Sequence, residues 1–403
     1  MDRKIRGWSG AFGARGCALL LACVGLALTL GLVSPFATSA PSFSGPTSYA
    51  TGLAPLSVAI GDLNRDGKPD LATANSNGNT VSVLANRGNG SFQPKLDYGT
   101  GHFPAWVAIG DLNGDGTPEL AIANGGDDTV SVLLNRGDGS FQPKLDYGTG
   151  RSPVSVAVGD LNGDGKSELA TANIGADTVT VLLNRGDGSF QPKLDYGTGR
   201  TPWSVAIGDL NGDGKPELAI PNNTANTVSV LRNRGDGSFE AKLDYGTGIW
   251  PTSVAIGDLN RDGKPDLVAA NSYENTVSVL ANRGGGGFRA KLDYATGRSP
   301  LSVAMGDLNG DSKPDLATAN EDDNTVSVLV NTTVFCTVPR LSRKALPAAK
   351  RVIASAHCRV GRIRRAYSKT VKKGRVISQT PKPGTLLPKR GKVNLVVSRG
   401  RKR

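Results

Sequence analysis

The sequence predicts an all-β fold, a six-bladed β-propeller, followed by a small α+β domain at the C-terminus. Two observations predict the propeller. The motif Asp-Leu-Asn-x-Asp begins six times at a constant spacing of 49 residues, from Asp62 to Asp307. Each unit also contains four short apolar or alternating segments, separated by turns that are rich in Gly or Asn. Four strands in a unit of about 45 residues are typical of a propeller blade.

The unit that spans residues 204–248 shows the expected strands most clearly. Residues 204–210 alternate between apolar and polar side chains, 217–221 form a short apolar run, 227–233 alternate again, and 238–245 form a more polar fourth strand. Period-2 alternation bounded by turn residues indicates strands. The sequence shows no 3.6-residue periodicity, which a helical solenoid would require.

The two ends of the repeat array predict that the ring closes. The last unit stops after its third strand, at Asn331. The N-terminal segment Ser42–Gly52 matches the fourth-strand segment Gly287–Gly297 in order and length. We therefore expect the N-terminal segment to complete the last of the six blades, which would leave no free sheet edge.

Charge divides the chain into parts that need separate explanations. We expect a signal peptide in 1–40, the propeller in 41–335, the small domain in 336–400 and a basic tail in 401–403. Residues 41–335 carry 22 Lys and Arg against 34 Asp and Glu, a net charge of −12. Residues 336–403 carry 21 Lys and Arg and no acidic residue.

The first 40 residues have the pattern of a secretory signal peptide. Basic residues lie in 1–16, residues 17–33 are apolar apart from Thr29, and small residues follow at Ala37 and Ala40. An uncleaved membrane anchor is the alternative, although 17 apolar residues are short for a span. We expect a secreted protein that has no membrane association after cleavage.

Each repeat contains a loop with the oxygen ligands that calcium prefers. In the fourth repeat Asp209, Asn211 and Asp213 offer side-chain oxygens at alternate positions, Lys215 offers its carbonyl, and Glu217 offers a closing carboxylate. We expect up to six structural Ca²⁺ sites. The other five ligand sets are Asp62, Asn64, Asp66, Lys68 and Asp70; Asp111, Asn113, Asp115, Thr117 and Glu119; Asp160, Asn162, Asp164, Lys166 and Glu168; Asp258, Asn260, Asp262, Lys264 and Asp266; and Asp307, Asn309, Asp311, Lys313 and Asp315.

The charge of the array agrees with bound calcium. Each site uses three carboxylates, so the six sites account for 18 of the 34 acidic residues, and six Ca²⁺ ions would cancel the net −12. Without metal, three carboxylates in one turn would repel each other. The sixth site has Ser312 where the others have Gly in a sharp turn, so we expect it to be the weakest. An acidic turn that binds nothing is the alternative.

Strand parity puts the loops between strands 2 and 3 and between successive repeats on the side opposite the calcium loops. These loops differ most between otherwise nearly identical repeats. Aromatic and arginine side chains gathered there suit stacking on sugars or anchoring a protein partner. Tryptophans that fill gaps between blades are the alternative. The expected ligand-face residues are Trp203, Trp250, Trp106, Phe103, Arg151, Arg200, Arg298 and Tyr273.

The repeats resemble integrin-α-type FG-GAP repeats, also known as VCBS-like repeats in bacterial surface proteins. The resemblance rests on the motif D-x-N-x-D-G-x-x-[DE], which occurs six times, with Ser for Gly in the last copy. It implies a propeller whose ligand face lies opposite the calcium loops. The Phe-Gly-Gly-Ala-Pro stretch that names the family is replaced by Gly-Thr-Gly-x-x-Pro, and integrins have seven copies.

The C-terminal segment is similar to a PASTA domain, a small αβ module of penicillin-binding proteins and extracellular kinase regions. The similarity rests on a helical stretch, 345–356, and on the motifs Gln379-Thr380-Pro381, Pro383-Gly384 and 395–400. It implies association with peptidoglycan, and the basic charge favours anionic wall polymers as partners. Nucleic acid is a less natural partner for a secreted chain.

Cys336 and Cys358 are the two cysteines outside the leader. We expect them to form one disulfide, which in the chain-entropy model stabilises the domain by about 3 kcal/mol. The only histidines are His102 and His357, which argues against a His-ligated catalytic zinc and a Ser-His-Asp triad.

The sequence therefore predicts a secreted, calcium-binding module for binding or adhesion at the cell surface, tethered to the wall by its basic domain. We expect a monomer without catalytic residues. A passive scaffold is one alternative, and a polysaccharide-acting enzyme such as a lyase is another, since some propellers carry catalytic sites.

Overall fold

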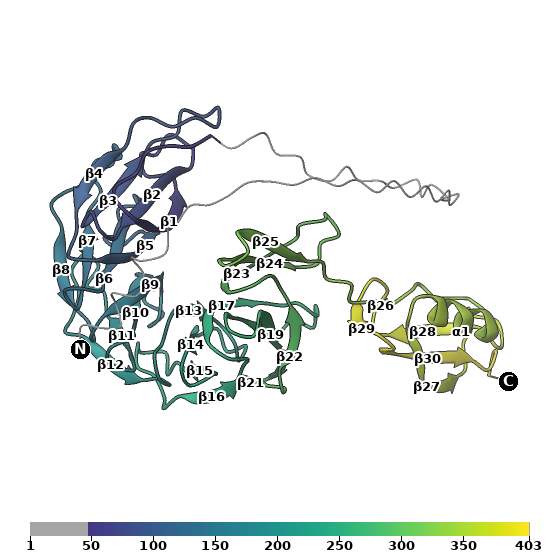
Figure 1. Ribbon diagram of the computed structural model, residues 1–403. Coiled ribbons are helices and arrows are strands. Elements are labelled where there is room, and N and C mark those ends of the chain that lie inside the picture. Colours follow the sequence, from purple (N-terminus) through teal and green to yellow (C-terminus); the bar gives the residue numbers. More distant parts are fainter. Residues whose placement is uncertain (1–46, 403) are drawn as a thin grey trace, which may run out of the picture. The chain divides into compact units, whose positions relative to one another are not determined.

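The computed structural model describes residues 47–402. The expected signal peptide, 1–40, and the first part of the N-terminal segment, 42–46, lie outside the described residues. Each of the six repeats forms its own antiparallel sheet, and Figure 1 shows these sheets following one another along the chain.

The first three repeats form four strands each. The first repeat contains β1 (Pro55–Gly61), β2 (Asp70–Asn75), β3 (Thr80–Leu84) and β4 (Leu96–Gly99). The second contains β5 (Pro104–Gly110), β6 (Glu119–Asn124), β7 (Thr129–Leu133) and β8 (Leu145–Gly148). The third contains β9 (Pro153–Gly159), β10 (Glu168–Asn173), β11 (Thr178–Leu182) and β12 (Leu194–Gly197). Within each sheet the strands lie in sequence order.

The last three repeats vary this plan. The fourth contains β13 (Ala206–Gly208), β14 (Glu217–Asn222), β15 (Thr227–Leu231) and β16 (Leu243–Gly246). The fifth contains β17 (Pro251–Gly257), β18 (Asp266–Asn271), β19 (Thr276–Leu280) and β22 (Leu292–Ala295), with a small hairpin of β20 (Asn282–Gly284) and β21 (Gly287–Phe288). The sixth has three strands, β23 (Pro300–Gly306), β24 (Asp315–Asn320) and β25 (Thr325–Leu329).

The strands agree with the expected segments, apart from two differences in length. The fourth strand of the fourth repeat begins only at Leu243, since Phe239 makes a single bridge to Asn233. Its first strand is also short. Pro221 stands where the third repeat has Ala172, and because Pro has no backbone N–H, pairing beside it reduces to isolated contacts.

The hydrophobic core lies between neighbouring sheets. Val81 of β3 and Ala72 of β2 pack with Val107, Leu120 and Ile122 of the second repeat, and all five side chains are buried. The same pattern recurs between the later repeats. Each repeat therefore buries its apolar faces only with the help of its neighbours.

A buried asparagine also joins each repeat to the one before it. Asn135 Nδ2 donates to the carbonyl of Leu63 in the first repeat, at 2.8 Å, and to the carbonyl of Pro118, at 2.9 Å. Four later asparagines make the corresponding bond to the preceding repeat, all at 2.7–2.8 Å. These bonds fix the spacing of adjacent sheets at the end that carries the acidic loops.

The described part of the N-terminal segment contacts the first sheet as a fourth strand of a preceding repeat would. The rings of Tyr49 and Phe92 meet edge to face at 5.2 Å, as those of Tyr98 and Phe141 do between the first two repeats. The N–H of Gly52 donates to an asparagine and a serine of the first sheet, as the N–H of the corresponding glycine donates to the second sheet.

The described residues do not close the ring. Among them, β25 has no fourth strand beside it, and its Val326 and Val328 are 66% and 54% exposed. On β1, Val58 is 61% exposed, whereas its counterpart Val107 is 2% exposed. The pairing of Ser42–Gly52 with the last sheet is thus absent from the described residues, and the closed six-bladed ring stays a prediction.

The C-terminal domain contains one helix and five strands among the described residues. They are β26 (Phe335–Thr337), α1 (Leu346–Ser355), β27 (Arg359–Ala366), β28 (Val376–Thr380), β29 (Leu386–Pro388) and β30 (Lys392–Ser398). Strand β30 pairs with β27 in parallel and with β28 antiparallel. Ala349 and Ile353 of α1 pack with Val376, Val393 and Leu395 of the sheet to form its core. Within residues 47–402, no helix has both the length and the apolar character that a membrane span requires.

Candidate functional site

The acidic loops fold around their own side chains. In the second repeat Asp111 accepts hydrogen bonds from the N–H groups of Gly114 and Gly116, at 2.7 and 2.9 Å. Asp115 accepts one from the N–H of Thr117 at 2.6 Å. The sequence folds this way because alternating Asp and Asn side chains can cap successive backbone N–H groups of a tight turn.

The last carboxylate of each loop is buried at the start of the second strand. Glu119 is fully buried, and its Oε2 accepts a hydrogen bond from the N–H of Leu112 at 2.7 Å. The Nδ2 group of Asn113 lies 3.2 Å from Oε1 of the same carboxylate. In the fifth repeat Asp266 is buried in the same way and accepts the N–H of Asn282.

Burial and like charges disfavour ionisation of these inner carboxylates. Burial raises the pKa of Glu119 to about 7, against the bonds from Leu112 and Asn135, and the charges of Asp115 and Asp111 act in the same direction as burial. Burial likewise raises the pKa of Asp266 to about 6.

The outer aspartate of the loop behaves differently. The bond from the N–H of Thr117 is the main cause that lowers the pKa of Asp115. In four of the five loops whose seventh residue is lysine, its side chain lies within 4.0 Å of the outer aspartate, as in the 3.1 Å pair of Lys68 and Asp66. The basic groups therefore compensate the exposed end of the loop and leave the buried carboxylate without a cation.

The structure brings the five predicted ligands of each loop into one turn, but their side chains bond mainly to backbone N–H groups. Among residues 47–402, no group of three or more Asp, Glu, His or Cys side chains has the arrangement of a metal centre. The donor set nevertheless consists of oxygen atoms, as a hard cation such as Ca²⁺ requires. The residues therefore fit calcium in chemistry and in sequence spacing.

The loops on the side opposite the acidic loops bond to each other within each repeat. The segment before the first strand bonds to the turn between strands 2 and 3, as Gly125 N–H does to the carbonyl of Phe103 at 3.0 Å and Ile174 N–H to that of Ser152 at 3.1 Å. The acidic loops pair instead with the turns between strands 3 and 4, through bonds such as Lys215 Nζ to the Arg234 carbonyl at 2.8 Å. The loops thus divide between two sides, as strand parity predicts.

All eight predicted ligand-face residues are exposed, so none of the tryptophans is a buried filler between sheets. The structure brings Trp250 and Tyr273 together, with ring centroids 5.0 Å apart at 61°. Arg298 lies beside Asp323, with its Nε 3.6 Å from Oδ1. Trp106 lies on β5, outside the loops. The contacts of the described residues do not gather these eight side chains into one cluster.

The residue before the proline has a positive φ in each of these loops. The φ angle is +55° at Phe103 and +59° at Trp250, and small residues occupy the same conformation in the other four repeats. A bulky side chain in the left-handed region is unusual and costs free energy, and such strain concentrates at functional sites. These two aromatic residues are therefore displayed by a backbone that does not favour them.

One polar pair on the side opposite the acidic loops is not among the ligand-face residues expected from the sequence. His102 Nδ1 lies 2.8 Å from Asp127 Oδ1, and Asp127 also accepts the backbone N–H of His102 at 2.7 Å. These bonds lower the pKa of Asp127. The signal was present, because His102 is the only histidine in the array and Asp127 replaces residues such as Gly78 and Ala176 of other repeats.

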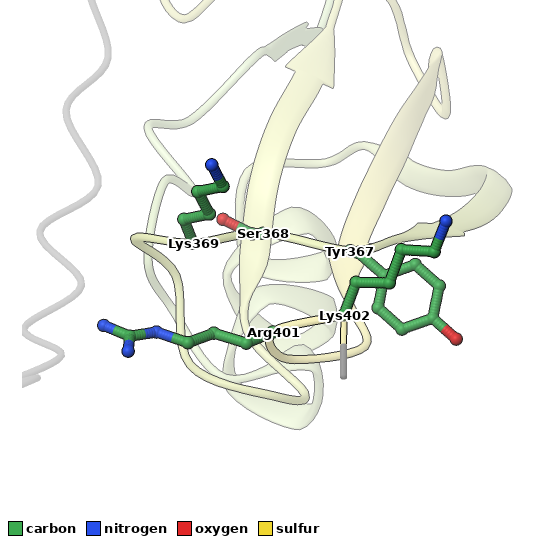
Figure 2. Close-up of a pocket in the computed structure, with 5 residues that line it drawn as sticks. All are labelled: Tyr367, Ser368, Lys369, Arg401 and Lys402. Carbon is green, nitrogen blue, oxygen red and sulfur yellow. The ribbon is translucent and has the colours of Figure 1, made fainter.

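A shallow hollow of about 560 Å³ lies at the end of the C-terminal domain. Figure 2 shows the side chains that line it, which come from the segment after β27 and from the end of the chain. Three of the five residues are cationic, and the domain has no acidic residue to neutralise them. The lining residues are Tyr367, Ser368, Lys369, Arg401 and Lys402.

The end of the chain is held in place next to this hollow. Ser368 N–H donates to the carbonyl of Gly400 at 2.9 Å, and Arg399 N–H donates to that of Ala366 at 2.8 Å. The guanidinium of Arg399 lies 5.8 Å from the ring centroid of Tyr367. The segment predicted as a basic tail, 401–403, therefore contributes two described residues to a concave surface. Sequence reasoning missed this because it depends on pairing between distant segments.

The structure also joins Cys336 to Cys358 in a disulfide, with Cα atoms 4.7 Å apart. Both cysteines are buried and belong to the core of the C-terminal domain. The bridge links β26, the first strand of this domain, to the residue before β27.

Repeated four-stranded antiparallel sheets, packed face to face and carrying an acidic loop after each first strand, define the class of propeller-like β-repeat proteins. A family model locates this class more closely. The chain belongs to the FG-GAP-like repeat family, whose model matches five overlapping windows that together span 62–318. The windows are 62–122, 111–171, 161–220, 218–269 and 258–318. A second model, the PASTA domain, matches residues 337–399.

Solved structures agree with the fold. A putative 6-phosphogluconolactonase from Bacteroides uniformis is 19% identical, with a TM-score of 0.53, over 70% of this chain and 82% of the other. One from Bacteroides fragilis is 19% identical, with a TM-score of 0.52, over 68% and 79%. A lectin of Agrocybe aegerita that recognises non-reducing terminal N-acetylglucosamine is 20% identical over 68% and 80%, at a TM-score of 0.46. At this identity the likeness of the two Bacteroides structures concerns the fold alone. No curated protein matches the chain.

Proposed function

We propose that this protein is a secreted, calcium-stabilised binding module that its C-terminal domain holds at the cell wall. FG-GAP-like repeats followed by a PASTA domain fit a surface binding module. The observation that carries the proposal is the division of charge. A domain with 21 basic and no acidic residues in 336–403 follows an array with a net charge of −12. Two parts of opposite charge suit two different partners.

Calcium is proposed as a structural component of the array. In each repeat the first, third and fifth loop residues, the seventh carbonyl and the ninth carboxylate would hold the ion. A bound Ca²⁺ would neutralise the inner carboxylate, which burial and two neighbouring aspartates otherwise disfavour in its charged form. The ion would supply charge neutralisation and rigidity to the loop, and no chemical step is assigned to it.

The C-terminal domain is proposed to bind an anionic wall polymer. Its hollow combines a tyrosine with three cationic side chains, which suits a sugar polymer that carries carboxylates or phosphates. We propose that the domain binds in this way without catalysis, and that the array faces other molecules at the surface.

Co-sedimentation of the full chain with purified peptidoglycan sacculi tests the proposal. The double variant Lys369→Gln/Arg401→Gln should bind roughly tenfold more weakly, as expected for two lost charged contacts of somewhat under 1 kcal/mol each. The matched control Lys350→Gln/Arg351→Gln removes the same charge from the exposed side of α1. Equal losses in both variants would point to non-specific charge attraction, and no binding by the unaltered chain would favour a passive scaffold.

A further inference from the structure

The fifth repeat carries an exposed aromatic pair that no core requires. Trp250 precedes β17 and Tyr273 lies between β18 and β19, so the two residues come from the paired loops of one repeat. Their side chains meet edge to face at 5.0 Å, yet Trp250 is 47% exposed and Tyr273 is 61% exposed. Aromatic side chains that seal a gap between sheets would be buried. Both residues of this pair are instead open to solvent.

The other repeats show that the fold does not need these aromatics. In the fourth repeat the corresponding residues are Thr201 and Thr224, whose hydroxyl oxygens lie 2.9 Å apart. The φ angle at Thr201 is +57°, against +59° at Trp250, so both loops have the same backbone conformation at this position. The third repeat has Ser152 and Gly175 at these two places. Two bulky rings therefore replace two small residues on an unchanged loop.

The pair is held in position by its surroundings. Asn226 of the fourth repeat accepts the N–H of Trp250 at 3.0 Å. The N–H and the hydroxyl of Ser272 both donate to the Trp250 carbonyl, at 3.0 and 3.1 Å. Such fixed loops present a side chain in the same place with and without a ligand, which lowers the ordering that binding requires.

A charged pair involves the residue next to Tyr273 in the chain. Glu274 follows Tyr273 in the chain, and its Oε2 lies 4.0 Å from Lys291 Nζ. Lys291 Nζ also lies 2.5 Å from Asp293 Oδ2, and the side chains of Glu274 and Lys291 are both partly exposed and accessible to a bound molecule. The rings stand edge to face and not as opposed walls, so they form a platform and not the cage that an ammonium group requires.

From this arrangement we propose that Trp250 and Tyr273 form a carbohydrate site. One pyranose ring of a surface glycan would stack its C–H face on the aromatic platform, and its hydroxyl groups would bond to Glu274 and Lys291. This inference specifies the class of ligand that the array binds and the repeat that binds it. It rests on the proposed function. The occupant is a neutral or N-acetylated sugar, whereas the basic domain takes an anionic polymer.

The test uses the full chain in calcium on an array of immobilised neutral and N-acetylated pyranose oligosaccharides, followed by calorimetry with the best binder. The variant Trp250→Thr/Tyr273→Thr installs the residues of the fourth repeat, so its fold should be retained, as melting curves can verify. It should bind at least about tenfold more weakly, as expected when two stacking rings are lost. The single variant Tyr273→Thr, at a position without backbone strain, should weaken binding in the same direction.

The control is Leu96→Ala, which removes an exposed apolar side chain from β4 of the first repeat, outside the expected ligand face. Its affinity should stay within about twofold of the unaltered chain, as is usual for surface changes away from a site. An unchanged affinity in the double variant would overturn the proposal, as would competition by choline in place of sugar. Binding to no sugar, with sacculus binding intact, would overturn this site alone. Loss of both would overturn the proposed function as well.

Discussion

The sixth residue of each acidic loop must adopt a left-handed backbone conformation. The φ angle is +82° at Gly214 and +62° at Ser312, the residue at the same place in the last repeat. A Cβ atom at Gly214 would have open space around it, so a substitution there changes only the conformational free energy.

We predict that Gly214→Ala lowers the free energy of unfolding by about 1 kcal/mol, because L-residues disfavour this region. Ser312→Gly should raise it by less than this, since the added freedom of the unfolded chain offsets part of the gain. Denaturant unfolding in calcium measures both. A destabilised Ser312→Gly variant would contradict the expected weakness of the sixth loop.

A second prediction at this scale concerns pH. Burial opposes ionisation of Asp97, but hydrogen bonds from Lys95 and Ser82 outweigh it and lower the pKa below its ordinary value of 3.8. A lowered pKa in the folded state means that Asp97 stabilises the fold above about pH 4, and that this contribution is lost as the pH falls through the folded value. Because the carboxylate is about one-third exposed, the contribution should stay under about 1 kcal/mol.

The variant Asp97→Asn isolates this effect. The difference in unfolding free energy between the unaltered chain and the variant should be constant from about pH 5 to 7 and should shrink below about pH 4. Denaturant unfolding at several pH values measures this difference. A difference that grows on acidification would show that the aspartate is not stabilised by its neighbours.

At the residue scale the repetition identifies the residues of each acidic loop but not their hydrogen-bond partners. Repetition at 49 residues makes Asp111 and Glu119 recognisable as members of one set. The buried carboxylate of Glu119 also accepts the N–H of Asn135, which follows β7, and no local pattern encodes this contact. For the same reason the contact of Trp250 with Tyr273 could not be derived, although both residues were selected as different from their counterparts.

At the scale of strands, the open edge of β25 is the main question. In the fifth repeat Ser278 pairs with Asp293 across β19 and β22. The 49-residue repeat places Ser327 in the position of Ser278, and the match of the N-terminal segment with Gly287–Gly297 places Ser48 in the position of Asp293. Facing residues of an antiparallel pair lie within the Cα separation that a disulfide needs.

We predict that the double variant Ser48→Cys/Ser327→Cys forms an intramolecular disulfide under oxidising conditions, which joins the two ends of the array. Mass spectrometry of a non-reduced digest would detect the linked peptides. The single variants are the controls, since neither can form this bond. Links between chains only, with monomers left open, would contradict closure and would indicate head-to-tail pairing of copies.

Strand positions were largely predictable because alternation and turn residues recur in every repeat. The exceptions have local causes that become visible only in pairing. Pro221 belongs to an apolar run in the sequence, yet its missing N–H shortens β13, the strand that pairs with it. The helix of the C-terminal domain was expected at 345–356 and is α1, Leu346–Ser355.

At the scale of the whole molecule, two parts of opposite charge are joined in one chain. The net charge of +12 conceals this division, which only a count by segment reveals. Composition and the two family models agree on the parts, but the hollow that Arg401 and Lys402 line requires the fold of the domain. The repeat pattern does not identify the ligands, because the repeats are almost identical and differ at few exposed positions.

The proposed function depends above all on stabilisation of the array by calcium. The most direct measurement is a calcium titration of the full chain by equilibrium dialysis, combined with thermal unfolding at each free calcium concentration. We predict uptake that approaches six ions per chain, one for each motif. We also predict a rise in unfolding free energy of about 2.7 kcal/mol per site at a hundred times the dissociation constant. A chain that takes up no calcium, and whose unfolding does not change with calcium or with a chelator, would contradict both predictions.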